Sequence, residues 1–398
     1  MPAYDVAVAG AGPAGLQFAR SVASRSEYDV VVLEANGSLA DNDKSTGGTF
    51  GEAIRRFDVP DAVVMDETDA VVFEAGGATG RVPASGYVLD FPALLEHLGD
   101  DAADHGATVR TGARVTDAVI EDGRVAGVEL GGGRERVTAD VVVDATGPAT
   151  ALVEDLGLFD PGGATRAVGK EYEVEGEHAV DDMLFRFDHD LAPGGYAWAF
   201  PAGAGVLKAG VCWLDTYYEA NATDRTASID DYVDRWLASD DRWTVDRRRA
   251  VHAGSAYIDD SLSRRATDGL VAVGDSVASI NPLLGEGIRP GMNSAEMAAD
   301  AVVDALDAGD VSRERLAAYE RRWKRDRGRH WRRQNLISHL FYGFDADQQR
   351  RFVQKIDGLS PAQVERFEAY DLTLRDYLSV YPLSGRDLLR VPRVLRRI

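Results

Sequence analysis

The chain has 398 residues, 45% of them hydrophobic, and its formal net charge at pH 7 is -22. This length and apolar content predict a folded protein of two or three domains and exclude a disordered chain. The strongly negative charge argues against general nucleic-acid binding.

Cysteine usage and hydropathy exclude further classes. Cys212 is the single cysteine, so we expect no intrachain disulfide and no metal or iron–sulfur site built from cysteines. No stretch approaches the roughly 20 apolar residues of a membrane span. The first predicted strand begins too close to Met1 for a signal peptide. We therefore expect a cytoplasmic protein with no bound metal.

The first predicted elements are a strand, a glycine-rich turn, a helix and a second strand. The first strand ends with the apolar run 6–9, the turn reads Gly-Ala-Gly-Pro-Ala-Gly over 10–15, and a helix is predicted over 16–24. The second strand covers 28–33 and ends at Glu34. This order is typical of a dinucleotide-binding fold.

The residues of this fingerprint have separate predicted roles. Gly10 makes the turn, Gly12 lets the backbone approach a pyrophosphate, and Gly15 lets the helix pack on the strand. Glu34 follows Gly15 by 19 residues, where such folds place the carboxylate that binds the ribose hydroxyls. The N-terminus of the helix offers unpaired N–H donors and a positive dipole end to the phosphates.

Shorter elements follow, up to residue 150. After a polar loop, Thr46-Gly47-Gly48 either lets the backbone approach a flat ligand ring or forms a flexible turn. A buried strand over 139–144 ends in Asp144-Ala145-Thr146-Gly147, which either contacts a cofactor or is a plain turn. Between them we predict a hairpin over 70–89, a helix over 92–105, and short strands over 108–110, 114–116 and 125–130.

The pattern of residue types changes twice in the second half of the sequence. From 151 to 257 it consists of strand-like runs rich in aromatic residues, with one helix over 229–238. A strand then leads into Gly274-Asp275, and a helix of small residues is predicted over 293–306. The remainder, 311–398, is predicted to be helical.

Together these motifs resemble FAD-dependent flavoproteins with a p-hydroxybenzoate-hydroxylase-like fold. They are the N-terminal GxGxxG with its distal acid, the mid-chain Asp144-Ala145-Thr146-Gly147, and Gly274-Asp275 followed by Gly285-Glu286-Gly287-Ile288. The resemblance implies an α/β fold: a Rossmann-like FAD-binding domain, an inserted antiparallel-sheet substrate domain and a C-terminal helical region. The expected ranges are 1–70 plus 92–150 plus 258–310 for the first, 71–91 plus 151–257 for the second, and 311–398 for the third.

The resemblance also implies how FAD is held. Asp275 would bond to the ribityl or pyrophosphate region. Gly287 and Ile288 would offer backbone N–H groups to the pyrimidine edge of the flavin, where negative charge builds on reduction. The residues expected to bind FAD are Gly10, Gly12, Ala14, Gly15, Glu34, Thr46, Gly47, Gly48, Val115, Ala145, Gly147, Gly274, Asp275, Gly285, Gly287 and Ile288.

Residues 196–201 read Tyr-Ala-Trp-Ala-Phe-Pro, and Gly210 follows them. They fit the YxWxFP pattern and the later glycine of the geranylgeranyl reductases, which the chain resembles most within this group. That family includes archaeal enzymes that saturate prenyl chains of membrane lipids. Three positions depart from that pattern. Thr46 stands where the family usually has a cysteine, 88–91 lacks an expected arginine, and Cys212 replaces a second glycine.

This resemblance implies that reduced FAD delivers a hydride to an alkene carbon while the neighbouring carbon takes a proton. Because side chains alternate along a strand, Tyr196, Trp198 and Phe200 share one face. They either wall a slot for an isoprenoid tail or belong to a packed core. No motif identifies the catalytic residues, and the candidate proton donors are Tyr196, Tyr217, His252 and Cys212.

Other functions and the electron donor stay open. The same fold supports a flavin-dependent monooxygenase or a halogenase-like enzyme, and a prenyl-chain carrier would bind isoprenoids without redox turnover. The one dinucleotide fingerprint is assigned to FAD, so we expect electrons from an external donor, either ferredoxin or NAD(P)H.

Charge is distributed unevenly along the chain. The 45 Asp, 21 Glu, 39 Arg and five Lys resemble the composition of proteins from extremely salt-loving archaea. Residues 311–335 nevertheless carry ten Lys or Arg against three acids. These cations either dock the protein peripherally on an anionic membrane or pair with the acidic first domain. They include Arg321, Arg322, Lys324, Arg325, Arg329, Arg332 and Arg333.

Overall fold

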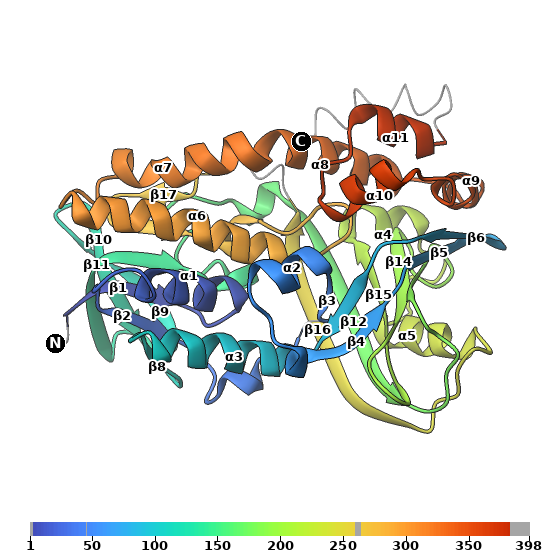
Figure 1. Ribbon diagram of the computed structural model, residues 1–398, viewed down its shortest axis with the longest axis horizontal. Helices are drawn as coiled ribbons and strands as arrows, with labels where there is room; N and C mark the ends of the chain where they lie inside the picture. Colours follow the sequence, from blue (N-terminus) through green and yellow to red (C-terminus); the bar gives the residue numbers. More distant parts are fainter. Residues whose placement is uncertain (1–2, 45, 259–263, 383–398) are drawn as a thin grey trace. The chain divides into compact units, whose positions relative to one another are not determined.

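The computed structural model describes residues 3–44, 46–258 and 264–382 (Figure 1). The chain divides into two compact units, each assembled from three segments. Residues 44–70 group with the second unit and 311–332 with the first, which differs from the division expected from the sequence. The first unit comprises Met1–Asp43, Phe91–Ala164 and Ala256–Arg332, and the second comprises Lys44–Asp90, Thr165–Ser255 and Arg333–Ile398.

The first unit is built on an eight-stranded sheet with parallel central strands. β1 (Ala3–Ala9) pairs in parallel with β2 (Val30–Leu33) and with β11 (Glu135–Asp144). All of β2 and the end of β1 are buried, which explains their continuous apolar runs. The other strands are β8 (Thr108–Arg110), β9 (Val115–Glu121), β10 (Arg124–Leu130), β17 (Ala266–Thr267) and β18 (Leu270–Ala272).

Helices pack beside this sheet, with α1 (Pro13–Ala23) against both α3 (Phe91–Asp104) and α6 (Ile288–Asp307) (Figure 1). The predicted helix over 92–105 is confirmed as α3. α6 begins five residues before its predicted start, because Pro290 falls in the first turn, where its missing N–H is not needed. The remaining helical segments are α7 (Arg313–Trp323), the π-helix η6 (Lys324–Gly328) and the short 3-10 turns η1 (Leu39–Asp41), η3 (Gly147–Ala149), η4 (Pro161–Gly163) and η5 (Gly274–Val277).

The second unit is built on a seven-stranded sheet in the order β16-β12-β15-β14-β13-β5-β6. Strand β14 is antiparallel to both β13 and β15, whereas β13 is parallel to β5. The predicted hairpin is confirmed as β5 and β6, which are followed by β7. The strands are β5 (Val71–Ala75), β6 (Ala78–Val82), β12 (Thr165–Glu175), β13 (Met183–Arg186), β14 (Gly195–Pro201), β15 (Val206–Leu214) and β16 (Arg247–Ile258); a small sheet joins β3 (Gly48–Phe50), β4 (Val64–Thr68) and β7 (Gly86–Leu89).

The two faces of the larger sheet carry different side chains. One face packs around Trp236 of α5 (Ile229–Ala238), which spans the predicted 229–238. The opposite face carries aromatic rings: the centroid of Phe185 lies 5.3 Å from that of Tyr196 and 5.1 Å from that of Phe200. We call this second face the aromatic face.

C-terminal helices add rings to the aromatic face. Figure 1 shows α9 beside β5 and β6. Phe341 of α8 lies 4.8 Å from Phe187, and Phe367 of α10 lies 6.4 Å from Phe73, between ring centroids. These helices are α8 (Arg329–Phe341), α9 (Ala346–Ile356), α10 (Pro361–Glu368) and α11 (Leu374–Val380), with the short α2 (Gly51–Arg56), η2 (Asp61–Val63) and α4 (Asp215–Asn221) elsewhere in the unit.

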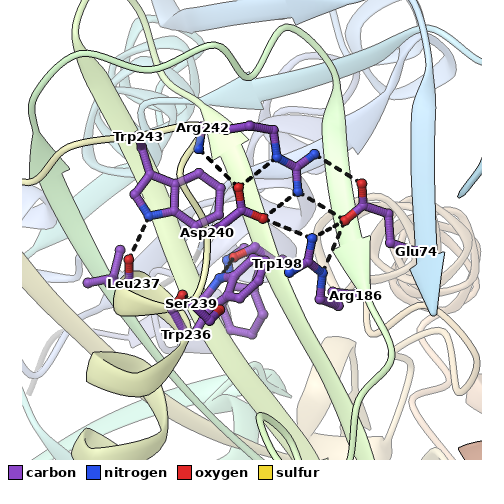
Figure 2. Close-up of polar contacts among 9 residues, drawn as sticks. All are labelled: Glu74, Arg186, Trp198, Trp236, Leu237, Ser239, Asp240, Arg242 and Trp243. Carbon is purple, nitrogen blue, oxygen red and sulfur yellow. Dashed lines mark hydrogen bonds and ion pairs between the residues drawn. The ribbon is translucent and has the colours of Figure 1, made fainter. Parts of the chain in front are cut away.

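Four charged side chains tie β5 and β13 to the segment after α5 (Figure 2). Arg242 donates to Asp240 at 2.8 Å and to Glu74 at 3.0 Å. Arg186 donates to Asp240 at 2.8 Å, pairs with Glu74, and lies over the ring of Trp236. Burial opposes the ionisation of Asp240, but the two arginines outweigh it and lower the pKa of Asp240 to about 2.

Candidate cofactor site and aromatic face

The glycine-rich turn between β1 and α1 leaves almost no space for side chains. Gly10 has a φ of +102°, and a Cβ atom placed on it would lie 2.4 Å from the carbonyl oxygen of Ala145. A Cβ atom on Gly15 would lie 2.0 Å from the carbonyl oxygen of Gly10. The packing of the turn itself therefore requires both glycines.

Gly12 is different, because no surrounding group lies within 4 Å of a Cβ atom placed on it. Gly12 is also the N-cap of α1 and provides no side-chain hydrogen bond to the helix. The first N–H groups of α1 are therefore left without a side-chain cap at the positive end of the helix dipole. Open space beside such N–H groups suits a phosphate.

Glu34 is buried at the end of β2 and fixes the glycine-rich turn. Its Oε2 accepts a hydrogen bond from the N–H of Ala11 at 2.9 Å, and its Oε1 accepts one from Asn36 at 2.8 Å. A carboxylate has about four acceptor positions, so this side chain can still accept a hydrogen bond from a ribose hydroxyl.

Asp144, at the end of β11, has an organising role that the sequence did not indicate. This fully buried carboxylate accepts backbone hydrogen bonds from Thr146, Leu152 and Val153 at 2.9 to 3.1 Å. Burial raises the pKa of Asp144, and these hydrogen bonds oppose the rise. Asp144 therefore shapes the turn that contains Gly147, whose φ is +66°.

The late Gly274-Asp275 motif lies against the first helix. The side chain of Ala14 is 2.8 Å from the Cβ position of Gly274, so Ala14 contributes to packing between α1 and η5. The carboxylate oxygens of Asp275 are 3.4 Å from the Cβ position of Gly287. The structure thus brings the three distant motifs of the first unit together, with the turn after β11 packed on Gly10.

The segment before α6 contains a buried ion pair that sequence reasoning missed. Gly285 has a φ of +72°, and Gly287 is the N-cap of α6 without a side-chain cap. Arg289, in the first turn, donates to Glu286 at 3.2 Å, and both side chains are buried. The signal was a charged pair three residues apart at the start of an apolar helix. Ile288 begins α6, and its expected contact with the flavin stays a prediction.

Val115 follows Ala113 by two residues, and the N–H of Ala113 donates to the carbonyl oxygen of Glu34 at 2.7 Å. Val115 begins β9, pairs with Leu130 of β10 and packs against the core of the first unit. Its expected contact with FAD stays a prediction.

The Thr46-Gly47-Gly48 segment belongs to the second unit and is closely packed there. Gly47 has a φ of +75°, and its Cβ position is 2.2 Å from the carbonyl oxygen of Leu89. Gly48 lies in β3, with its Cβ position 3.0 Å from the side chain of Phe200. The backbone is therefore fixed by neighbours, which does not fit the flexible turn considered above. Contact of these residues with FAD stays a prediction.

The strand β14 carries its three motif aromatics on one face, as strand alternation predicts. The ring centroids of Tyr196 and Trp198 are 6.1 Å apart, and Tyr196 also stacks on Tyr342 at 6.5 Å. Tyr196, Trp198 and Phe200 are 9%, 7% and 5% exposed. The three rings are therefore closely packed with others, and their role as walls of a substrate slot stays a prediction.

Trp198 explains the glycine that follows the aromatic motif. Its Nε1 donates to Oε2 of Glu171 at 2.7 Å, and the indole lies across Gly210 to reach that oxygen. A Cβ atom on Gly210 would lie only 2.3 Å from Cζ2 of Trp198. The strand register agrees with this contact: Gly210 of β15 is paired with Trp198 of β14 on one side and with Glu171 of β12 on the other.

The candidate proton donors occupy different surroundings in the second unit. The hydroxyl of Tyr217 donates to the carbonyl oxygen of His339 at 2.6 Å. His252 is buried, and its Nε2 lies 3.8 Å from Oε2 of Glu173. Burial raises the pKa of the Cys212 thiol to about 12 and raises the pKa of Tyr196.

Several cations of the 311–335 stretch are engaged by acidic side chains or by a backbone carbonyl. Arg322 pairs with Asp300 of α6, and Lys324 donates to Glu320 at 2.6 Å. Arg333 donates to the carbonyl oxygen of Leu372 at 2.8 Å. Among the helices of the described ranges, none has the length and apolar character needed to cross a bilayer.

Comparison with known proteins extends these observations. A family model described as lycopene cyclase protein matches residues 5–384. The chain is 40% identical to the digeranylgeranylglycerophospholipid reductase of Haloferax volcanii, over 80% of this chain and 81% of the relative. It is 27% identical to digeranylgeranylglycerophospholipid reductase 2 of Methanothermobacter thermautotrophicus, over 97% of this chain and 100% of the relative.

Solved structures show the same fold. A geranylgeranyl bacteriochlorophyll reductase-like protein of Thermoplasma acidophilum superposes with a TM-score of 0.84 at 20% identity, covering 99% of this chain and 100% of the other. A flavin-dependent brominase superposes with a TM-score of 0.70 at 16% identity, with full coverage of both chains. The motifs, the fold and the identity to curated reductases agree, and the chain belongs to the geranylgeranyl reductase family of FAD-dependent oxidoreductases.

Proposed function

We propose that this protein saturates carbon–carbon double bonds in the isoprenoid chains of a prenyl lipid. The observation that carries the proposal is the 40% identity, over four-fifths of both chains, to a reductase named for a geranylgeranylated phospholipid. The intact fingerprint and the aromatic motif support the same activity. The brominase shares the fold at 16% identity, and a likeness at this level shows the fold alone.

The residues of the first unit fit FAD. We assign the pyrophosphate to the N-terminus of α1 at Gly12, the ribose to Glu34, and the pyrimidine edge of the flavin to the start of α6 at Gly287 and Ile288. The open space at Gly12 and the uncapped first turns of α1 and α6 support this assignment. When bound, FAD supplies the hydride for the reduction.

The aromatic face of the second unit is the proposed binding surface for the lipid chain. An isolated alkene is a poor hydride acceptor, so the protein must hold it in place and exclude water. Tyr196, Trp198 and Phe200 suit this task because their rings are apolar, rigid and held by neighbouring rings.

The electron donor and the route to the lipid are part of the proposal. We expect ferredoxin or NAD(P)H to reduce the protein by transient docking, and the cations of 311–335 to contact an anionic membrane. Flotation with anionic and neutral liposomes at equal ionic strength tests the membrane contact. Equal recovery with the two liposomes would contradict it.

Anaerobic turnover tests the activity itself. The protein is purified in high salt, reduced chemically and mixed with a geranylgeranylated phospholipid. We expect the oxidised flavin spectrum to return and mass spectrometry to show two added hydrogens for each bond reduced. No reoxidation after prolonged incubation would contradict the proposal. A colourless protein would favour a carrier, and oxygen-dependent consumption of NAD(P)H with halide incorporation would favour a halogenase.

A further inference from the structure

Glu171 of β12 is a buried carboxyl group with an unused hydrogen-bonding position. The residue is 2% exposed, and its Oε2 accepts the hydrogen bond from Trp198. Within the described residues its other oxygen, Oε1, meets no donor with normal hydrogen-bond geometry, although the side chain of Thr46 also interacts with the carboxyl group. A buried polar atom without a partner is costly, so it calls for a physical reason, such as a bound proton, water or ligand.

Several groups face this carboxyl from the surrounding elements. Lys208 of β15 is 2% exposed and donates to the carbonyl oxygen of Thr46 at 3.3 Å. Lys208, the side chain of Thr46, and His252 of β16 all favour the charged form of Glu171. Burial is the larger influence, so the pKa of Glu171 is raised. The carboxyl thus holds a proton more strongly than an exposed glutamic acid does.

Strand register places Glu171 at the edge of the aromatic face. Glu171 is opposite Gly210, Gly210 is opposite Trp198, and Trp198 is opposite Phe185. These four residues form one row across β12, β15, β14 and β13, so their side chains lie on the same side of the sheet. The row joins a proton-holding group directly to the proposed lipid surface.

We propose that Glu171 donates the proton that completes reduction of the double bond, an assignment that rests on the proposed function. A hydride forms a C–H bond at one alkene carbon, the π bond breaks, and its electron pair takes the carboxyl proton of Glu171 at the neighbouring carbon. The alkene gains two hydrogens, and Glu171 becomes a carboxylate. Trp198 and Lys208 then stabilise that charge until water returns a proton.

Two of the four candidates predicted from the sequence, Cys212 and Tyr217, are less suited to this step. Cys212, with a pKa of about 12, is a weak acid, and the Tyr217 proton is engaged with a backbone carbonyl. Glu173 lies two residues from Glu171 on the same face, but its carboxylate faces His252 and lies 3.3 Å from Arg249. The His252 contact and the nearby cations lower the pKa of Glu173, so Glu173 is ionised and serves as a matched control.

The first experiment needs no lipid. Infrared spectra of the flavin-loaded protein at neutral pH are compared for wild type, Glu171→Gln and Glu173→Gln. We expect the wild-type spectrum minus that of Glu171→Gln to show the stretching band of one buried protonated carboxyl, and the wild-type spectrum minus that of Glu173→Gln to lack it. Any band from buried Asp144 is common to the three proteins and cancels. A spectrum that Glu171→Gln leaves unchanged would overturn the assignment.

The second experiment measures a single turnover. Reoxidation of the chemically reduced protein by a geranylgeranylated phospholipid should slow by about 100-fold or more in Glu171→Gln, and little in Glu173→Gln, at equal flavin content. If the lipid fails to reoxidise wild type, the proposed function fails. If wild type reacts and Glu171→Gln stays within about twofold of it, only the proton donor is misassigned.

A pH profile covers the case in which Glu171→Gln does not fold. Removing the indole N–H in Trp198→Phe keeps an aromatic ring and should raise the pKa of Glu171. The pH above which single-turnover reoxidation slows should then move upward, because the donor keeps its proton to higher pH. An unmoved profile would contradict the role of Glu171.

Discussion

Replacing Gly210 by alanine tests how closely β15 is packed beneath the indole of Trp198. The new Cβ atom would lie 2.3 Å from Cζ2 of Trp198 and 2.5 Å from the carbonyl oxygen of Lys170. Neither neighbour is the flexible end of a side chain. The indole must therefore move away, and moving it breaks its hydrogen bond to Glu171.

The expected loss of stability combines two effects. Overpacking a buried site costs about 1–3 kcal/mol. Leaving the buried partners of a broken hydrogen bond unsatisfied costs about 1–3 kcal/mol. Because one displacement causes both, the costs overlap, and we expect Gly210→Ala to lower the free energy of unfolding by about 2–4 kcal/mol.

Gly169 provides the matched control on the same face of the sheet. Its Cβ position is 3.4 Å from Cβ of Cys212 and 3.7 Å from Cη2 of Trp198, which are ordinary contact distances. We expect Gly169→Ala to change the free energy of unfolding by no more than about 1 kcal/mol. The assay is equilibrium urea unfolding in molar salt, followed by circular dichroism. Equal free energies for the two variants would refute the packing argument.

Three further predictions concern the fingerprint, the ion-pair network and the thiol. Gly12→Ala should keep the stability of the apoprotein but lose bound FAD, whereas Gly15→Ala should destabilise the fold. Thermal unfolding measures the stability, and flavin absorbance measures the FAD content. Full FAD content in Gly12→Ala would contradict the assignment of the pyrophosphate to the N-terminus of α1. Asp240 has a pKa of about 2 against its ordinary 3.8, so its stabilisation is complete above about pH 4 and is lost as the pH falls toward 2. In Asp240→Asn the free energy of unfolding should depend less on pH between about 4 and 2, with a difference of no more than about 2 kcal/mol. An unchanged pH dependence in this range would refute the prediction. Cys212 is a half-buried residue, but desolvation of its thiol raises the pKa to about 12, so Cys212 should react slowly with iodoacetamide at pH 8 until the protein is unfolded. Rapid labelling of the native protein would contradict this.

The sequence by itself determined the elements that depend on local pattern. The apolar run, glycine spacing and distal Glu34 predicted β1, α1 and β2, and the helix predicted over 229–238 is α5. Alternation along β14 predicted that its three aromatic rings share a face. The start of α6 was predicted at 293, five residues too late, and Pro290 lies in the first turn, where a proline leaves a helix intact.

Only the tertiary structure decided which side chains meet. The four-charge network joins Glu74 to residues 112 and 168 positions away. Glu171 reaches Trp198 across Gly210 because three strands lie in one register, and a shift of one residue would turn these side chains to opposite faces. Local sequence sets the period of a strand, whereas register between strands is fixed by long-range packing, and that packing created the buried carboxyl at the edge of the aromatic face.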